Sequence, residues 1–228
     1  MINHPELSVL IITEVECGTD FPWPEFGGGM DHVRTSYLSE LPADLSDIDA
    51  ILTAGKLTGK REIDRMLEFV RAGGAWLALV GLSDIRLPEA FGVQPGPVGP
   101  HSELRVLFTD SDNFLGVRLP DAVYVDGFYQ PLQVTAEGTE TVLYADWHYA
   151  HSSVLTTRPY GKGYLASTTL QDFGAQMIRQ TFYRLLRSFQ NEAPAADVSL
   201  GIGILGYAPS VGKFHGRAAE NTLGLHLV

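Results

Sequence analysis

The sequence has a single cysteine, no excess of positive charge and no long apolar run. Cys17 stands alone among 228 residues, which excludes an internal disulfide framework and suits a reducing compartment. Lys and Arg number 16 against 27 Asp and Glu, and the net charge of −11 argues against non-specific nucleic-acid binding. No stretch approaches the roughly twenty apolar residues of a membrane span, and the N-terminus lacks the basic start of a signal peptide. We therefore expect a cytoplasmic protein with neither a nucleic-acid nor a membrane partner.

Three apolar runs and one amphipathic helix dominate the first third of the chain. Residues 8–13, 50–53 and 75–80 are continuous apolar segments, typical of strands buried on both faces. Between the last two, Thr58 is a plausible N-cap and Gly73 a plausible end for a helix. Its apolar side chains recur at helical spacing: Ile63, Met66, Leu67 and Val70. Strand, helix and strand with short connections predict a parallel sheet covered by helices.

The later part of the chain has a different pattern. Residues 103–146 are short, turn-separated strands of antiparallel character, and residues 160–163 suit a hairpin turn. An amphipathic helix is expected within residues 177–189, and residues 191–197 are the best linker candidate. Residues 33–41 fit either a strand or a short helix.

Three segments carry a resemblance to a known family. They are LSDIDAIL at residues 45–52, FVRAGGA at residues 69–75 and YGKGY at residues 160–164, in this order. On these segments, residues 8 to about 190 resemble the ThuA-like branch of the class I glutamine-amidotransferase fold. The resemblance implies a flavodoxin-like α/β three-layer sandwich with a mostly parallel sheet, and a loose connection to sugar utilisation.

The last thirty residues carry a second resemblance. Residues 198–228 read as an apolar strand, a glycine-bearing turn, a short helix and the start of another strand, which is half of a dinucleotide-binding βαβ unit. GILG at residues 203–206, GKFH at 212–215 and RAA at 217–219 resemble the N-terminus of the glucose–fructose oxidoreductase, inositol dehydrogenase and MocA family. That family uses NAD(P) to oxidise or reduce sugars and cyclitols.

The glycine turn would hold a pyrophosphate only in an intact domain. There, the backbone N–H groups around Gly206, Ala208 and Gly212 would bind the cofactor at the positive end of a helix. Ala208 replaces the usual second glycine, and the spacing to Gly212 is one residue longer than usual. The acidic residue that grips the ribose, roughly twenty residues past the turn, would lie beyond residue 228. For this chain alone we therefore expect a ligand-free turn and no bound cofactor.

The turn after the third apolar run is where the amidotransferase fold carries its cysteine nucleophile. Ungapped counting places Val80 there, and a shift of three residues places Ser83, next to Asp84. A structural turn capped by Ser83 or Asp84 is the favoured interpretation, because the sequence marks no general base that would activate a nucleophile there. Cys17 follows the first strand, the wrong place for this chemistry, so an inert thiol is expected. Residues 171–172 are Gln-Asp where the ThuA pattern usually carries Gly-His.

Polar residues after several strands could still converge in one crevice. Loops at the carboxyl ends of parallel strands form sites in open α/β sheets. The weak catalytic candidates on this ground are Glu14, Asp31, His32, Ser83 and Asp84. For each of them singly, ordinary loop polarity is the favoured interpretation.

Two further groups were considered as binding residues. Asp146, His148 and His151 could ligate a metal if they lay on a helix, but the segment reads as a loop or strand end, so no metal site is predicted. The aromatic segment at residues 128–131 could stack on a sugar, although aromatic residues on antiparallel strands more often fill a core or an interface.

These patterns predict a ThuA-like α/β domain at residues 1–190, a linker at 191–197 and an incomplete Rossmann segment at 198–228. We expect an accessory domain of an NAD(P)-dependent sugar or cyclitol oxidoreductase, without glutaminase activity of its own. The 228-residue chain alone would then have no enzymatic activity. It would be part of an oxidoreductase only if the natural chain continues past residue 228. A stand-alone sugar hydrolase or isomerase stays open, as does a non-catalytic module for carbohydrate binding or homo-oligomerisation.

Overall fold

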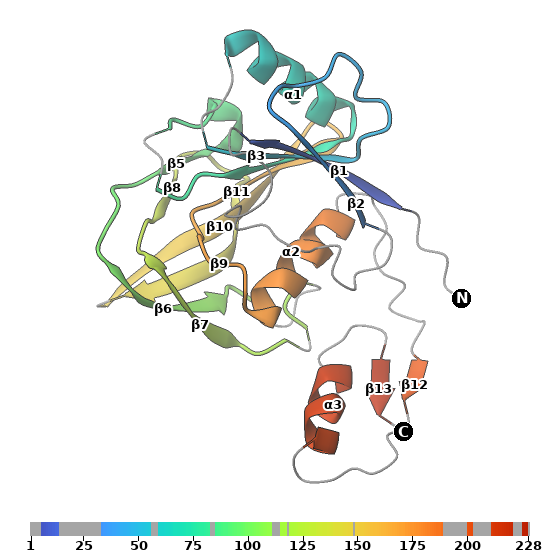
Figure 1. The fold of residues 1–228 in the computed structure, drawn as a ribbon. Helices are drawn as coiled ribbons and strands as arrows, with labels where there is room; N and C mark the ends of the chain where they lie inside the picture. The colour runs from blue at the N-terminus through green and yellow to red at the C-terminus, as the bar shows by residue number, and fades with distance from the viewer. Residues whose placement is uncertain are drawn as a thin grey trace.

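The fold is built on one large mixed sheet with a helix on each face (Figure 1). It is taken from a computed structural model. The structure describes residues 6–13, 33–55, 59–82, 85–110, 115–117, 119–147, 149–188, 200–202, 211–220 and 225–227. Within them the main sheet has 11 strands and a second sheet has two.

One half of the main sheet is parallel. Its strands lie side by side in the order β2 (Val33–Leu38), β1 (Leu7–Thr13), β3 (Ala50–Ala54), β4 (Ala75–Leu79) and β11 (Gly163–Thr168). This order is that of flavodoxin-like sheets. Every residue of β1 and β4 is buried, as expected for parallel strands covered on both faces. In the segment that the sequence left undecided, residues 33–41, the first six residues form the edge strand β2.

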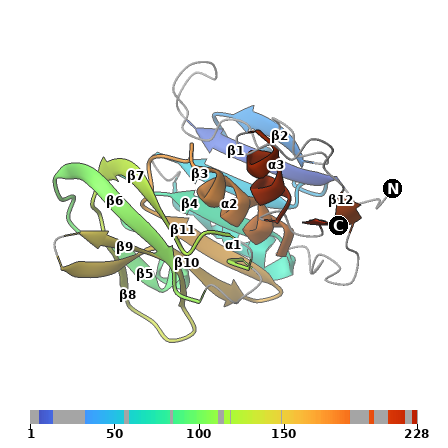
Figure 2. The same ribbon diagram turned by 90° about the horizontal axis from the view of Figure 1, so that it is seen from below.

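The two helices cover opposite faces of this half, which makes three layers (Figures 1 and 2). Helix α1 (Lys60–Ala72) buries Met66 and Val70 in one core cluster with Trp76 of β4. It ends at Gly73, whose φ of 129° and N–H bond to the Val70 carbonyl close the last turn. The predicted cap Thr58 lies outside the described residues.

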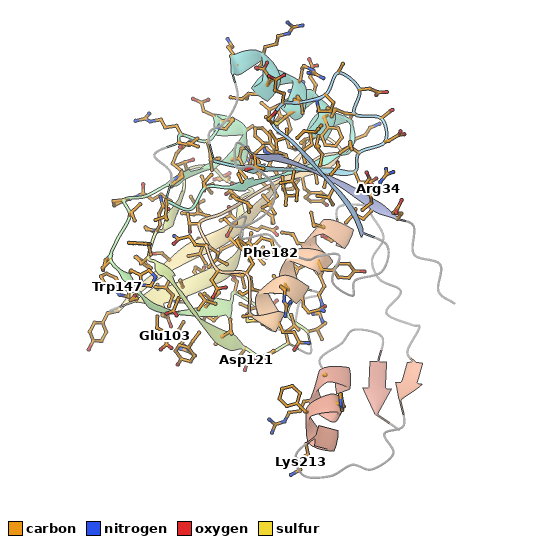
Figure 3. All side chains as sticks on the ribbon, in the orientation of Figure 1. Arg34, Glu103, Asp121, Trp147, Phe182 and Lys213 are labelled. Carbon is orange, nitrogen blue, oxygen red and sulfur yellow. The ribbon has the colours of Figure 1, made fainter. Side chains whose placement is uncertain are left out.

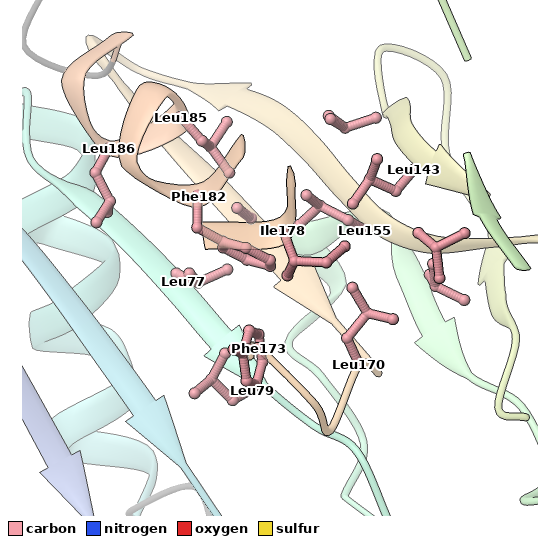
Figure 4. Packing of buried hydrophobic residues seen from close by; sticks show 14 of the residues in the cluster. Leu77, Leu79, Leu143, Leu155, Leu170, Phe173, Ile178, Phe182, Leu185 and Leu186 are labelled. Atoms are coloured by element: carbon pink, nitrogen blue, oxygen red, sulfur yellow. The ribbon is translucent and has the colours of Figure 1, made fainter. Parts of the chain in front are cut away.

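Helix α2 (Gln176–Ser188) packs on the other face. Ile178, Phe182 and Leu185 of α2 belong to the same core cluster as Leu77 and Leu79 of β4, and Figure 4 shows the Phe182 ring beside Leu77. The side chain of Phe182 is 0% exposed, so this helix binds the parallel half through a full apolar stripe.

The other half of the sheet is antiparallel. It continues from β11 through β10 (Ala150–Tyr160), β9 (Glu140–Trp147), β6 (His101–Phe108) and β7 (Ala122–Phe128). A short pair, β5 (Val93–Pro95) and β8 (Leu132–Val134), joins β10 from the side and follows a 3₁₀ turn at Glu89–Phe91. Figure 2 shows β6, β7 and β9 at the end of the sheet away from β1 and β2.

The expected α/β fold is confirmed, with one correction to the sheet. It is parallel among its N-terminal strands but mixed as a whole, because the antiparallel strands join the same sheet through the β10–β11 hairpin. That hairpin has the predicted turn, with Gly161 at a φ of 64°.

The C-terminal residues form a small unit of their own. Strands β12 (Leu200–Ile202) and β13 (Leu225–Leu227) pair in parallel, and α3 (Val211–Glu220) lies between them in the chain. Gly212 and Gly216 of α3 are buried, whereas Lys213 and His215 are exposed. Figure 1 shows this strand–helix–strand unit apart from the large sheet. The proposed linker, residues 191–197, lies outside the described residues. None of the described helices is long and apolar enough to cross a membrane.

Candidate functional site

The carboxyl ends of the parallel strands meet at one edge of the sheet. Strands β1, β3, β4 and β11 all run toward this edge. Because neighbours alternate in direction across the antiparallel half, β9 and β7 also end there. Ligands of open α/β sheets bind outside such an edge. We call this region the carboxyl edge; its described part consists of residues 80–82, 128–131, 147 and 168–172.

The turn after β4 has an unusual backbone. Leu82 has a φ of 63°, in the left-handed region that leucine seldom adopts, and its side chain is 53% exposed. Val80, which ungapped counting placed at the turn, directly follows β4 and is still held against β11, because its N–H donates to the Thr168 carbonyl at 2.9 Å. Within the described part of this turn, the residue with the left-handed backbone is therefore Leu82, which has no nucleophilic atom. Ser83 and Asp84 lie outside the described residues.

A buried glutamine fixes this turn. The Leu82 N–H donates to Oε1 of Gln130 at 2.9 Å, and Nε2 of Gln130 donates to the Gly96 carbonyl at 3.3 Å. The Gln130 carbonyl accepts from the Thr169 hydroxyl at 2.6 Å, and Gln130 is 1% exposed. Gly81 is equally confined, since a Cβ there would lie 2.8 Å from the Thr169 carbonyl oxygen. Gln130 thus connects the turn after β4 to β5 and to the loop after β11.

A second glutamine ties the end of β7 to the same loop. Oε1 of Gln171 accepts from the Phe128 N–H at 3.2 Å, and its Nε2 donates to the Phe128 and Thr169 carbonyls at 3.4 Å. Asp172 accepts from the Gly174 N–H at 2.7 Å. At the position where the ThuA pattern carries Gly-His, this chain therefore has side chains that hold main-chain atoms.

Aromatic rings gather beside these glutamines. Tyr129 stacks on Trp147 with centroids 5.4 Å apart, and Phe128 meets His101 edge-on at 5.0 Å. Tyr129 is 7% exposed, and its hydroxyl is buried without a partner in the described part of the chain. Phe128 and Trp147 are only half-buried, and Figure 3 labels Trp147 at the outer side of the antiparallel half. The aromatic segment is thus partly core and partly surface.

The residues considered for metal binding form a cross-strand ion pair instead. Asp146 of β9 accepts from Arg105 of β6 at 3.2 Å and contacts Nδ1 of His151 on β10 at 2.5 Å. The His151 ring stacks on Tyr144 at 4.1 Å. His148 lies outside the described residues, and those that are described contain no group of three His, Cys, Asp or Glu side chains able to hold a metal.

Most of the predicted site residues fall outside the described part of the chain. This applies to Glu14, Asp31, His32, Ser83 and Asp84, and to Gly206 and Ala208 of the glycine turn. Gly212 is described, and it lies in the first turn of α3. The predicted convergence of the crevice residues therefore stays a prediction. Sequence reasoning missed Gln130 and Leu82.

The main α/β unit is similar in fold to solved ThuA-like proteins. No family model and no curated protein matches the chain. A ThuA-like protein of Parabacteroides merdae ATCC 43184 superimposes with a TM-score of 0.62 at 11% identity, covering 82% of this chain and 91% of that one. Another, from Bacteroides uniformis ATCC 8492, gives 0.57 at 13% identity over 81% and 91%. The main α/β unit has a ThuA-like fold.

A much longer enzyme shares this fold over part of its length. A β-galactosidase from Rahnella sp. R3 matches with a TM-score of 0.59 at 17% identity and 82% of this chain. The match covers 32% of that enzyme, so this chain corresponds to about a third of it. At such identities the likeness concerns the fold alone.

Proposed function

We propose that the ThuA-like unit is an accessory domain of an NAD(P)-dependent sugar or cyclitol oxidoreductase of the glucose–fructose oxidoreductase, inositol dehydrogenase and MocA type. The observation that carries the proposal is the strand–helix–strand unit at residues 200–227, whose two strands are parallel. A strand, a helix and a second strand parallel to the first, with glycine near the start of the helix, is how a dinucleotide-binding domain begins.

The glycines of α3 support this assignment. Gly212 and Gly216 are four residues apart and both buried, so this face of the helix can approach the strands closely. Two three-residue strands and one helix cannot bury a sheet by themselves. In this proposal further strands come from polypeptide beyond residue 228, which would also carry NAD(P) and the hydride transfer.

The turn after β4 supports an accessory role for the ThuA-like unit. A glutaminase needs a nucleophile on this turn, and in the described part of the turn the residue with the left-handed backbone is Leu82, which has no nucleophilic atom. A sugar as the substrate class agrees with the family resemblance of residues 198–228 and with the β-galactosidase that shares the fold. A cytoplasmic location belongs to the same proposal.

The test combines an intact mass with an activity assay. We expect the protein from its native host to exceed 24.9 kDa by mass spectrometry. The complete polypeptide should then reduce NAD(P)⁺ with at least one sugar or cyclitol of a panel, whereas the 228-residue chain should not. A native mass of 24.9 kDa, or turnover by the 228-residue chain alone, would overturn the proposal.

A second candidate is a non-catalytic carbohydrate-binding module, favoured by the half-buried Phe128 and Trp147 at the carboxyl edge. Sugar-dependent quenching of fluorescence that Trp147→Phe abolishes and Trp23→Phe leaves intact would support it. Quenching that survives Trp147→Phe would exclude this edge as the binding site.

A further inference from the structure

A cleft lies beside the turn after β4, on the side of the β5–β8 pair. Its volume is about 450 Å³, within the range of small-molecule sites. Its wall includes Ile85, Arg86, Gln94, Gly96, Pro97 and Gln133. We call it the Arg86 cleft; none of these residues belongs to the carboxyl edge or to the C-terminal unit.

The floor of the Arg86 cleft is held in place by hydrogen bonds. Oε1 of Gln94 accepts from the Leu87 N–H at 3.1 Å, and its Nε2 donates to the Leu87 carbonyl at 2.7 Å. The Gly96 N–H bonds the Pro131 carbonyl at 2.7 Å, and a Cβ on Gly96 would come within 2.9 Å of the Pro131 ring. A ligand would therefore meet a wall that is already ordered, which lowers the entropic cost of binding.

The charge of the cleft is opposite to that of the chain. Arg86 is exposed and has no ion-pair partner in the described ranges, where the arginines found in ion pairs are Arg34 and Arg105. The protein carries a net charge of −11, so its overall field repels anions. An unpaired guanidinium on a concave wall supplies the local attraction, and its planar donors match a carboxylate or a phosphate.

The other wall groups suit hydroxyls and a carbon skeleton. The amide of Gln133 reaches over Gly96, because its Nε2 would lie 3.4 Å from a Cβ placed there. This exposed amide can both donate and accept. Ile85 and Pro97 provide apolar surface beside it.

We infer that the Arg86 cleft binds a small polyhydroxylated anion, a sugar phosphate or a sugar acid, with Arg86 on the anionic group and Gln133 on hydroxyls. The inference does not depend on the proposed oxidoreductase, since it uses no residue of the C-terminal unit.

Binding there would be sensed at the turn after β4. The carbonyl of Gly96 accepts from Gln130, and Gln130 in turn accepts from the Leu82 N–H. The Leu82 amide is therefore a reporter two hydrogen bonds away from the ligand.

The test is an NMR titration of the ¹⁵N-labelled 228-residue chain with glucose 6-phosphate, gluconate, inorganic phosphate and glucose at constant ionic strength. We expect saturable shifts of the Arg86, Gly96 and Gln133 amides with at least one of the two anionic sugars. Saturation by glucose 6-phosphate alone would identify a phosphate ligand, and by gluconate alone a carboxylate. Inorganic phosphate and glucose should each bind about tenfold or more weakly, because each lacks one of the two recognised features.

Two variants test whether Arg86 binds the anionic group. Arg86→Gln should weaken binding by about tenfold or more, whereas Arg61→Gln, the same charge change on the exposed face of α1, should leave it unchanged. Unchanged spectra elsewhere show that each variant is folded. The inference is wrong if neither anionic sugar gives saturable shifts, if Arg86→Gln binds like the parent, or if glucose or inorganic phosphate binds as tightly as the anionic sugars.

Discussion

Replacing Gln130 by leucine tests the connection between the turn after β4 and the rest of the sheet. Leucine is similar in size but has no polar atom, so the Leu82 N–H loses its acceptor and the Gly96 carbonyl loses its donor. Each part-buried main-chain group left unsatisfied costs about 1–3 kcal/mol. Since one bond is 2.9 Å and the other 3.3 Å, we expect the lower part of this range for the second. The free energy of unfolding should fall by about 2–4 kcal/mol.

Urea unfolding followed by circular dichroism measures this loss, provided that the m-value is unchanged. The matched control is Gln133→Leu, an exposed glutamine three residues away, which should stay within about 0.5 kcal/mol of the parent. If Gln130→Leu lost no more free energy of unfolding than the control, the conclusion that Gln130 holds the turn after β4 in place would be refuted.

Gln130→Glu adds a pH-dependent arm to the same experiment. A protonated carboxyl can donate to Gly96 and accept from Leu82 as the amide does, whereas the buried carboxylate can only accept. Burial raises the pKa of the introduced carboxyl in the folded state. Its stability deficit should therefore be small at low pH and grow as the pH rises from the unfolded pKa, near 4.3, toward the folded one. A stability deficit of Gln130→Glu that did not change with pH would contradict these hydrogen bonds to Leu82 and Gly96.

Three further predictions concern the framework. Gly163→Ala should cost about 3 kcal/mol or prevent folding, because its Cβ would lie 2.0 Å from the Gly74 carbonyl oxygen; near-parental thermal stability would show a looser contact. Phe182→Ala, at a side chain 0% exposed, should lose about 3–5 kcal/mol in urea unfolding, and a loss below about 1 kcal/mol would contradict the packing of α2. The Ser46 N–H lowers the pKa of Asp44 by hydrogen bonding to its carboxylate, so the stabilisation is present above the unfolded pKa and lost as the pH falls through the folded one. Unfolding of Asp44→Asn should therefore converge with the parent at low pH, and a gap that widens on acidification would refute this.

The parallel half could be predicted because its signals are local. The apolar runs of β1 and β4 and the spacing of Met66 and Val70 in α1 are each read within a dozen residues. The edge strand β2 gave a weaker pattern, since Arg34 is exposed and a strand paired on one side needs fewer apolar residues.

The site could not be read in the same way. Leucine gives no indication of a left-handed backbone, which the sequence signals through glycine or asparagine. Gln130 bonds a residue 48 positions earlier in the chain at one end and 34 positions earlier at the other, so its partners emerge only from the tertiary structure. The mixed sheet has the same origin, because the sequence indicated antiparallel strands but not that they would extend the parallel sheet.

The pairing of β4 with β11, which are far apart in the sequence, has a consequence for folding during synthesis on the ribosome. Ala75 pairs with Tyr164, and the entire antiparallel half is made between them. During the roughly 5–20 seconds that a ribosome needs for that segment, β4 has an open edge and lacks the helix α2 that covers Leu77. The nascent chain therefore exposes an entirely apolar strand, β4, at the stage when unpaired strand edges aggregate most readily. Production of this protein should depend on chaperone capacity more than its final stability would suggest.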